Sequence, residues 1–293
     1  MLDHLFGGDW TEAKLGCLRA YLEQYRAIFT VNARAKYFTT WYVDAFAGTG
    51  SRTIINQRSG ETDLDETDLD SEASAYRVGS AMIALDVKSP FDKYLFIEKS
   101  KAKCEQLKVE IAERYSSLLP RCEFRVDDAN VAISDWCKQR DWKKDRAVVF
   151  LDPFGMQVNW EIVKLLGSTE GIDLWYLFPF IARLLKHDGK IEETWRSRLD
   201  ALFGTNDWYS EFYKKAIRTD LFGDYEVTER DATAANIQRY IENRLKSCFV
   251  AVAPSLVLRN SKQSPLFALC FAASNKKGAP IALRIASSIL KEC

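Results

Sequence analysis

The chain lacks several features that mark common classes of protein. It has only two histidines, His4 and His187, and its seven cysteines form no Cys-x-x-Cys pair. We therefore expect no metal site, and we expect mostly buried, reduced thiols. No apolar run approaches the roughly 20 residues needed to cross a bilayer, and residues 1–14 lack a basic segment followed by a long apolar stretch. These absences predict a cytoplasmic protein with no membrane association.

A net charge is also lacking, because 41 basic residues balance 41 acidic residues. The balance hides an acidic segment: residues 60–75 hold seven acids and no Lys or Arg. We interpret the insert at about 58–76 as a solvated loop. A metal-binding loop is the alternative, although the segment lacks the glycine and the terminal glutamate of a calcium loop. The rest of the chain has seven more basic than acidic residues, which is compatible with a polyanionic partner.

Short apolar runs alternate with helix-like segments through the first 182 residues. Strands are predicted at 39–46, 93–100, 122–130, 146–155 and 172–180, and helices at 10–31, 79–87, 100–118 and 130–140. Strands that alternate with helices of this length predict right-handed crossovers and a mostly parallel sheet. Near the end of the chain, residues 250–260 and 265–274 are predicted to form an antiparallel hairpin, followed by a helix at about 280–290.

The pattern changes at about residue 183. Residues 183–247 have helix-like spacing, including the stretch 207–223, and are rich in Arg, Lys, Trp and Tyr. We predict a helical lobe at 183–247, inserted into one α/β domain made of residues 1–182 and 248–293. The basic residues of the lobe and of the stretch 135–146 favour either phosphate contacts or ordinary solvated helix surfaces.

Two glycines follow the acid that ends the first predicted strand, in "VDAFAGTG". In a doubly wound sheet the loop after this strand contacts the ligand, and glycine allows a sharp turn there. A nicotinamide fingerprint would need Gly or Ala where the chain has Thr53, and an acid about 20 residues further on. No Gly-Lys-Ser/Thr of a phosphate-binding loop follows either. The spacing therefore disfavours both of these nucleotide sites.

Asp44, Phe46, Gly48 and Gly50 instead form a D-x-F-x-G-x-G pattern that resembles the first motif of class I S-adenosylmethionine-dependent methyltransferases. The resemblance implies a Rossmann-like, seven-stranded, mostly parallel sheet that ends in an antiparallel hairpin. It also implies that Glu98 contacts the ribose and that Asp128 contacts the adenine, with Asp127 as a competitor and helix capping as the alternative role of Asp128. The implied cofactor-binding residues are Asp44, Ala45, Phe46, Gly48, Thr49, Gly50, Glu98, Asp128 and Ala129.

After the fourth predicted strand comes "LDPFG", residues 151–155. Asp152, Pro153 and Phe154 resemble the Asp-Pro-Pro-Tyr/Phe motif of amino-methyltransferases, in which acceptors orient an exocyclic amine and the aromatic ring stacks on the base. A similar Asp-Pro-Phe-Gly occurs in transfer-RNA guanine methyltransferases. The alternative is a tight turn at the strand end, which Asp-Pro and Phe-Gly both favour.

Over nearly its whole length the chain resembles the three-Cys-motif partner protein family, TcmP. The resemblance is carried by "YVDAFAGTG", "LFIEKS", "DDAN", "VVFLDPFGMQVNW", the closing residues 264–290 and the leading Trp10-x-x-x-Lys14. It implies association with a three-Cys-motif, radical-S-adenosylmethionine-like partner protein. The acidic insert departs from the family pattern.

From these motifs we expect an S-adenosylmethionine-dependent amino-methyltransferase that acts on a base of RNA or DNA and releases S-adenosylhomocysteine. Asp152, Pro153 and Phe154 are the expected catalytic residues. Two alternatives stay open: a non-catalytic methyltransferase-like module that binds a nucleotide or the partner, and a methyltransferase for small molecules or proteins.

Overall fold

The computed structural model describes residues 9–50, 79–181, 185 and 189–292. The acidic insert at 58–76, Thr53, Arg183 and Lys186 fall outside these residues, so the expectations about them stay predictions.

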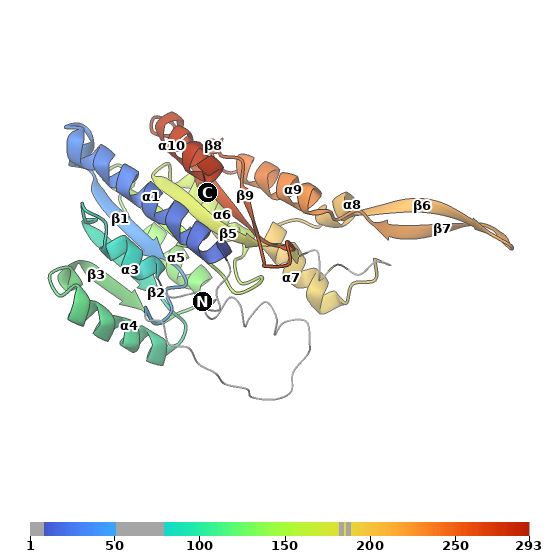
Figure 1. Cartoon of the computed structure of the whole chain (residues 1–293), viewed down its shortest axis with the longest axis horizontal. Coiled ribbons are helices and arrows are strands. Elements are labelled where there is room, and N and C mark those ends of the chain that lie inside the picture. The colour runs from blue at the N-terminus through green and yellow to red at the C-terminus, as the bar shows by residue number, and fades with distance from the viewer. Residues whose placement is uncertain (1–8, 51–78, 182–184, 186–188, 293) are drawn as a thin grey trace, which may run out of the picture.

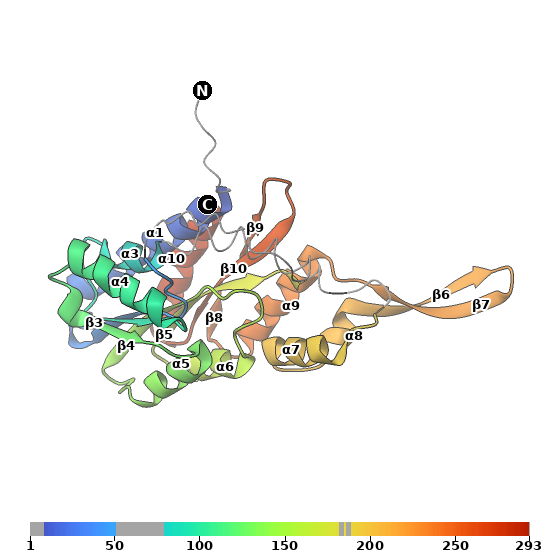
Figure 2. The same cartoon turned by 90° about the horizontal axis from the view of Figure 1, so that it is seen from below.

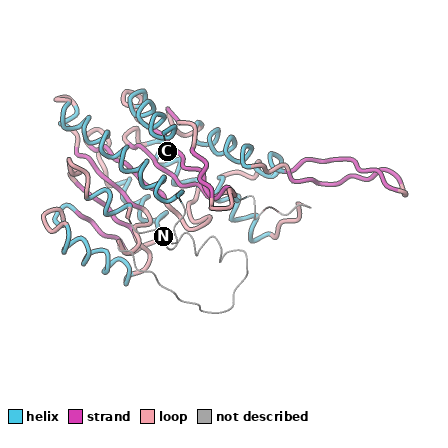
Figure 3. Tube along the Cα trace, in the orientation of Figure 1, coloured by secondary structure: helices cyan, strands magenta, loops and turns pink. Residues whose placement is uncertain are grey.

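A central sheet of eight strands forms the middle of the molecule (Figures 1 and 3). Its strands are β1 (Thr39–Asp44), β2 (Lys93–Ile97), β3 (Cys122–Arg125), β4 (Asp145–Leu151), β5 (Ile172–Pro179), β8 (Ala251–Val252), β9 (Leu256–Arg259) and β10 (Pro265–Ala273). The order is β3-β2-β1-β4-β5-β10-β8, and β9 also pairs with β10. The first five strands are parallel, whereas β10 is antiparallel to β5. A doubly wound sheet with an antiparallel strand beside β5 confirms the predicted Rossmann-like class I methyltransferase fold.

Helices cover both faces of the sheet, because its strands are apolar on both sides (Figure 2). One face packs against α1 (Asp9–Val31), α3 (Ser80–Leu85), α4 (Lys101–Arg114) and α10 (Ala279–Glu292). The other face packs against α5 (Ala129–Lys138), α6 (Trp160–Ser168), α7 (Glu193–Phe203), α8 (Trp208–Phe212) and α9 (Ala234–Lys246). Single 3₁₀ turns, η1 (Ala35–Tyr37) and η2 (Leu119–Arg121), precede β1 and β3. The helices predicted at both ends of the chain are confirmed, and α6 is a helix that our sequence analysis did not predict.

The closing hairpin differs in one detail from the seven-stranded prediction. Residues 250–260 form two short strands, β8 and β9, rather than one, and both pair with β10. Pro254 lies between them and has no N–H to donate to the ladder. The interruption is held in place because Glu242 of α9 accepts hydrogen bonds from the backbone N–H and the hydroxyl of Ser255, at 2.8 and 2.6 Å. Together β8 and β9 occupy the place of one strand.

The segment 183–247 is not wholly helical, so the helix predicted over 207–223 is wrong beyond α8. Strands β6 (Tyr213–Asp220) and β7 (Gly223–Arg230) form a separate antiparallel hairpin that projects away from the sheet (Figures 1 and 2). β-branched Ile217 and Thr219 in β6 and Val227 and Thr228 in β7 favour extended backbone. Gly223 has a φ of 114°, which the tight turn requires.

The described cysteines are mostly free thiols: Cys104, Cys122, Cys137, Cys248 and Cys270. Cys17, which is fully buried, is disulfide-bonded, so the expectation of reduced thiols is wrong for this residue. Within the described ranges no cluster of three or more His, Cys, Asp and Glu side chains is arranged to hold a metal ion. None of the described helices has the length and apolar character needed to cross a membrane.

Candidate active site

A pocket of about 240 Å³ lies at the carboxyl ends of β1, β2 and β3. This is the edge of a doubly wound sheet where ligands bind. The loop after each of these three strands, and the loop after β4, contributes to the wall. The lining residues are Ala45, Phe46, Glu98, Lys99, Lys103, Asp127, Asp128, Ala129, Phe154 and Gln157. The structure therefore brings together residues from all four predicted motifs.

The glycine loop after β1 is anchored to the strands on both sides of it. Ala45 N–H donates to Phe150 O at 3.1 Å, and Ala47 N–H donates to Ile97 O at 2.9 Å. Gly48 and Gly50 have φ angles of 63° and 77°, where glycine avoids strain. A Cβ on Gly50 would lie 2.6 Å from Met82 and 2.7 Å from Leu107. Close approach of α3 and α4 thus explains Gly50, where sequence reasoning had expected close approach of a ligand.

Asp44 is fully buried at the end of β1 and lies behind the pocket wall. Its Oδ1 accepts from the Phe46 N–H at 3.2 Å, and its Oδ2 accepts from the Tyr42 hydroxyl at 3.3 Å. Burial raises the pKa of Asp44 to about 6, and the nearby charge of Asp152 acts in the same direction. Asp44 fixes the start of the glycine loop, and direct cofactor contact remains a prediction.

Glu98 connects the β2 exit to the glycine loop. Its Oε2 accepts from the Gly48 N–H at 3.1 Å, and its Oε1 accepts from the Ser100 N–H at 2.8 Å. A carboxylate has about four lone-pair sites, so acceptor capacity is left on the pocket side. The position suits a group that holds two ribose hydroxyls.

Asp128 lines the pocket and also caps α5, so both of its proposed roles are compatible with the structure. Its Oδ1 accepts from the Asn130 N–H at 2.9 Å. Asp127 lines the same pocket and accepts from the Asp128 N–H at 2.8 Å. Ala129, in the first turn of α5, presents only a methyl group, which leaves room for a flat ring.

Asp152, directly after β4, makes a contact that the sequence analysis did not predict. Its Oδ2 accepts from the Lys14 ammonium of α1 at 2.7 Å, and the two side chains are only 11% and 2% exposed. The Lys14 ammonium also lies 5.5 Å from the centre of the Trp10 ring. The resemblance had marked Trp10 and Lys14 without giving them a role. Neither Asp152 nor Lys14 is among the described residues that line the pocket.

Pro153 and Phe154 carry the chain from β4 into a turn beside the pocket. The Phe154 N–H donates to Gln157 Oε1 at 3.1 Å, and Gly155 has a φ of 57°. Asn130 ties the turn to α5 through Gln157 O at 2.9 Å and the Asn159 N–H at 2.9 Å. The tight turn and the aromatic wall are therefore both present.

None of the described residues of the stretch 135–146 or of the lobe lines this pocket. Trp136, in the stretch 135–146, is fully buried, and Arg140 lies 4.7 Å from the Trp41 ring. Lys138, Lys143 and Lys144 of this stretch are exposed, so its phosphate contacts stay a prediction. Trp208 and Phe212 of the lobe are buried in the core cluster. Lys99, Lys103 and Gln157 line the pocket without having been predicted. Only their positions, next to Glu98 and Phe154, would have indicated them.

Comparisons with known proteins find similar solved structures but no similar sequence. No protein-family model matches the chain, and no curated protein matches its sequence. Protein LPL1258 from Legionella pneumophila, of family DUF519, is similar in structure, with a TM-score of 0.50 and 9% identity over 98% of this chain and 93% of that one.

The methyltransferase domain of bacterial CtHen1-C has a TM-score of 0.36 and 12% identity over 88% and 98% of the two chains. The glycopeptide N-methyltransferase MtfA, solved with S-adenosylhomocysteine, has a TM-score of 0.31 and 9% identity over 86% and 89%. The likeness to LPL1258 shows the fold of this chain, and the two weaker ones add nothing to it.

Proposed function

We propose that the chain is an S-adenosylmethionine-dependent methyltransferase whose acceptor is an amino nitrogen of a nucleic-acid base. The observation that carries the proposal is that the loops after β1, β2, β3 and β4 together line one pocket. Acceptors for a nucleoside come from Glu98 and Asp128, and an aromatic wall comes from Phe154. The loop after β4 contributes Phe154 to that pocket, and Asp152 and Pro153 directly precede Phe154 in the chain.

The residues present fit the cofactor. Glu98 is nearly buried yet lines the pocket, which suits the binding of ribose hydroxyls. Asp128 offers a carboxylate at the start of α5, and Ala129 leaves space for a ring. When bound, S-adenosylmethionine supplies an electrophilic methyl group on sulfur.

We assign the positioning of the target base and its amine to Asp152, Pro153 and Phe154. A carboxylate oxygen of Asp152 accepts an N–H of the target amine and orients its lone pair, so positioning supplies much of the rate enhancement. Phe154 offers its ring as a stacking surface, worth about 1–3 kcal/mol for a base. In a duplex, the target base has to leave the stack to reach this turn.

The test is calorimetric titration of S-adenosylmethionine and S-adenosylhomocysteine into the purified chain, followed by labelled methyl transfer into RNA and DNA pools. Saturable binding that is weakened by Glu98→Gln and unchanged by Asp135→Asn, an exposed acid of α5, supports the proposal. No binding by the folded protein would rule out autonomous methyl transfer.

A second candidate is a non-catalytic module that assembles with a partner, for which the three-Cys-motif protein is our proposal. It is favoured by apolar side chains on the projecting hairpin, where Leu221 is 98% and Ile217 is 75% exposed. Isolated two-stranded hairpins are marginally stable in water. The cofactor titration separates the two candidates.

A further inference from the structure

The buried pair of Lys14 and Asp152 has consequences for the chemistry of the acceptor. Lys14 belongs to α1 and Asp152 to the exit of β4, so two elements far apart in sequence meet at the carboxyl edge of the sheet. The two groups are 2.7 Å apart and almost fully withdrawn from water. A buried charge in proteins is normally paired, because an isolated one is costly.

The pair leaves one carboxylate oxygen available. Oδ2 of Asp152 accepts from Lys14, and no hydrogen bond to Oδ1 is present within the described part of the chain. Asp44, which is buried nearby, is a further acidic group that acts on this site. Thr11, one helical turn before Lys14, has a buried hydroxyl with no hydrogen-bond partner among the described residues. The site is therefore polar and incompletely satisfied.

The ammonium of Lys14 changes what the free oxygen can attract. A lone carboxylate attracts a nearby cation, and the attraction is stronger in a partly buried site than in water. With an ammonium on its other oxygen the pair is neutral overall, and most of that attraction is cancelled. The free oxygen still accepts a hydrogen bond from a neutral N–H group.

We propose that Lys14 is a positioning residue that makes the Asp152 site selective for a neutral, planar amino group conjugated to a ring, over a cationic alkylamine. Exocyclic amines of nucleobases have this chemistry, whereas the side chain of lysine and polyamines carry a positive charge at neutral pH. The inference rests on the proposed function, and it deepens that function by assigning the residue that sets the preference for a neutral amine. Lys14 acts through Asp152 by holding one oxygen and offsetting its charge.

The experiment measures the binding of small probes to the full chain saturated with S-adenosylhomocysteine, which keeps nucleosides out of the cofactor pocket. The probes are adenosine and cytidine, which are neutral, and butylammonium, which is a cation; saturation-transfer NMR reports their affinities. We expect the intact protein to prefer the nucleosides. Lys14→Met should weaken nucleoside binding and strengthen butylammonium binding, each by about tenfold, because it exposes an uncompensated carboxylate.

Three further variants separate this effect from a purely structural role. Lys14→Arg restores the cation and should keep the preference of the intact protein. The double variant Lys14→Met/Asp152→Asn removes both charges of the pair, so it should fold even if Lys14→Met does not, and it should still exclude butylammonium. Lys164→Met removes an ammonium that lies 2.7 Å from Glu161 on the exposed surface of α6, and it should change nothing.

Each outcome bears on a separate claim. If S-adenosylhomocysteine does not bind the intact protein, the proposed function fails and the inference falls with it. If it binds, but the nucleosides do not, or Lys14→Met leaves the preference unchanged, the inference alone is overturned. Butylammonium binding to the double variant would also overturn it.

Discussion

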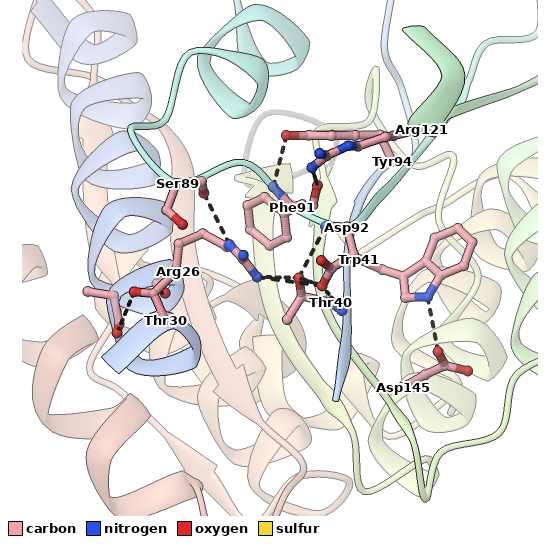
Figure 4. A network of polar contacts seen from close by, with 11 residues as sticks. Arg26, Thr30, Thr40, Trp41, Ser89, Phe91, Asp92, Tyr94, Arg121 and Asp145 are labelled. Atoms are coloured by element: carbon pink, nitrogen blue, oxygen red, sulfur yellow. Dashed lines mark hydrogen bonds and ion pairs between the residues drawn. The ribbon is translucent and has the colours of Figure 1, made fainter. Parts of the chain in front are cut away.

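The two ends of the central sheet both bury charged side chains, but they use them differently. At the amino end, Arg26 of α1 donates to Ser89 O at 3.1 Å and to the Thr40 hydroxyl, and Asp92 accepts from the Thr40 N–H and hydroxyl at 2.8 and 2.6 Å (Figure 4). At the carboxyl end, Lys14 of the same helix makes an ion pair with Asp152 Oδ2, and Asp152 Oδ1 accepts no hydrogen bond from the residues that the structure describes.

This difference separates structural from functional polar groups. The amino-end network joins α1 to the start of β1 and to the loop before β2, and its hydrogen bonds lie within the protein (Figure 4). Beside the pocket, Glu98, Asp128 and Asp152 retain acceptor capacity. Of these, Glu98 and Asp152 are buried, and buried polar groups with spare acceptor capacity at a ligand-binding edge indicate a site where a ligand completes the bonding.

The largest effect that we expect comes from breaking the carboxyl-end pair. Lys14→Met should lower the free energy of unfolding by about 3–5 kcal/mol, because it leaves a buried carboxylate unpaired. The double variant Lys14→Met/Asp152→Asn should recover most of this loss. Urea denaturation measures both, and equal stability of the single and double variants would show that the pair is not the cause.

The next effect concerns Asp173, which lies near the amino end of β5. Burial raises its pKa from 3.8 to about 6, while the Tyr21 hydroxyl donates to it at 2.6 Å. The folded state binds the proton of Asp173 more tightly than the unfolded state does. Asp173 therefore adds to the free energy of unfolding below about pH 4, and this stabilisation is lost as the pH rises through 6.

Between pH 4 and 6.5, ionisation of Asp173 should lower the free energy of unfolding by an amount on the order of 3 kcal/mol. Asp173→Asn should remove this share of the pH dependence of the free energy of unfolding, measured by denaturation across that range. The exposed variant Asp135→Asn serves as control. An unchanged slope in Asp173→Asn would contradict the raised pKa.

A smaller effect should appear in ligand affinity, which we expect to depend on residues at the carboxyl end of the sheet and not on residues at its amino end. Asp44→Asn should weaken S-adenosylhomocysteine binding by about tenfold or more, because it perturbs the charge-assisted bond that fixes the glycine loop. Arg26→Met should leave the affinity of the folded protein unchanged, since Arg26 lies at the opposite end of the sheet. Calorimetry at a temperature where both variants are folded measures this, and equal losses would erase the distinction between the ends.

The smallest effect should come from an exposed ion pair of the same length as the buried one. Lys164→Met breaks the contact with Glu161 at 2.7 Å, where both side chains are about half exposed or more. Water screens such pairs, so the free energy of unfolding should fall by less than about 1 kcal/mol. A loss as large as that of Lys14→Met would show that distance, rather than burial, sets the energy.

Sequence reasoning worked best where the local pattern and the tertiary environment agree. The buried parallel strands β1, β4 and β5 are apolar on both faces, and the turn residues after them mark the carboxyl edge. It failed over 213–230, because charged residues dominate that segment and obscure the alternation of its β-branched residues. It also missed the break at Pro254, where only pairing of β8 and β9 with the same strand shows that the ladder continues.

The sequence alone determined the order of strands β1 to β5 and the helices at the two ends of the chain. It also determined the glycine loop and the acids that follow or end β1, β2 and β4, because these depend on neighbouring residues. The tertiary structure decided the rest. Lys14 and Asp152 are 138 residues apart and meet only because α1 packs across the sheet. The raised pKa of Asp44 likewise depends on burial by α3 and the surrounding strands. Burial and long-range pairing are properties of the packed core, so no local pattern records them.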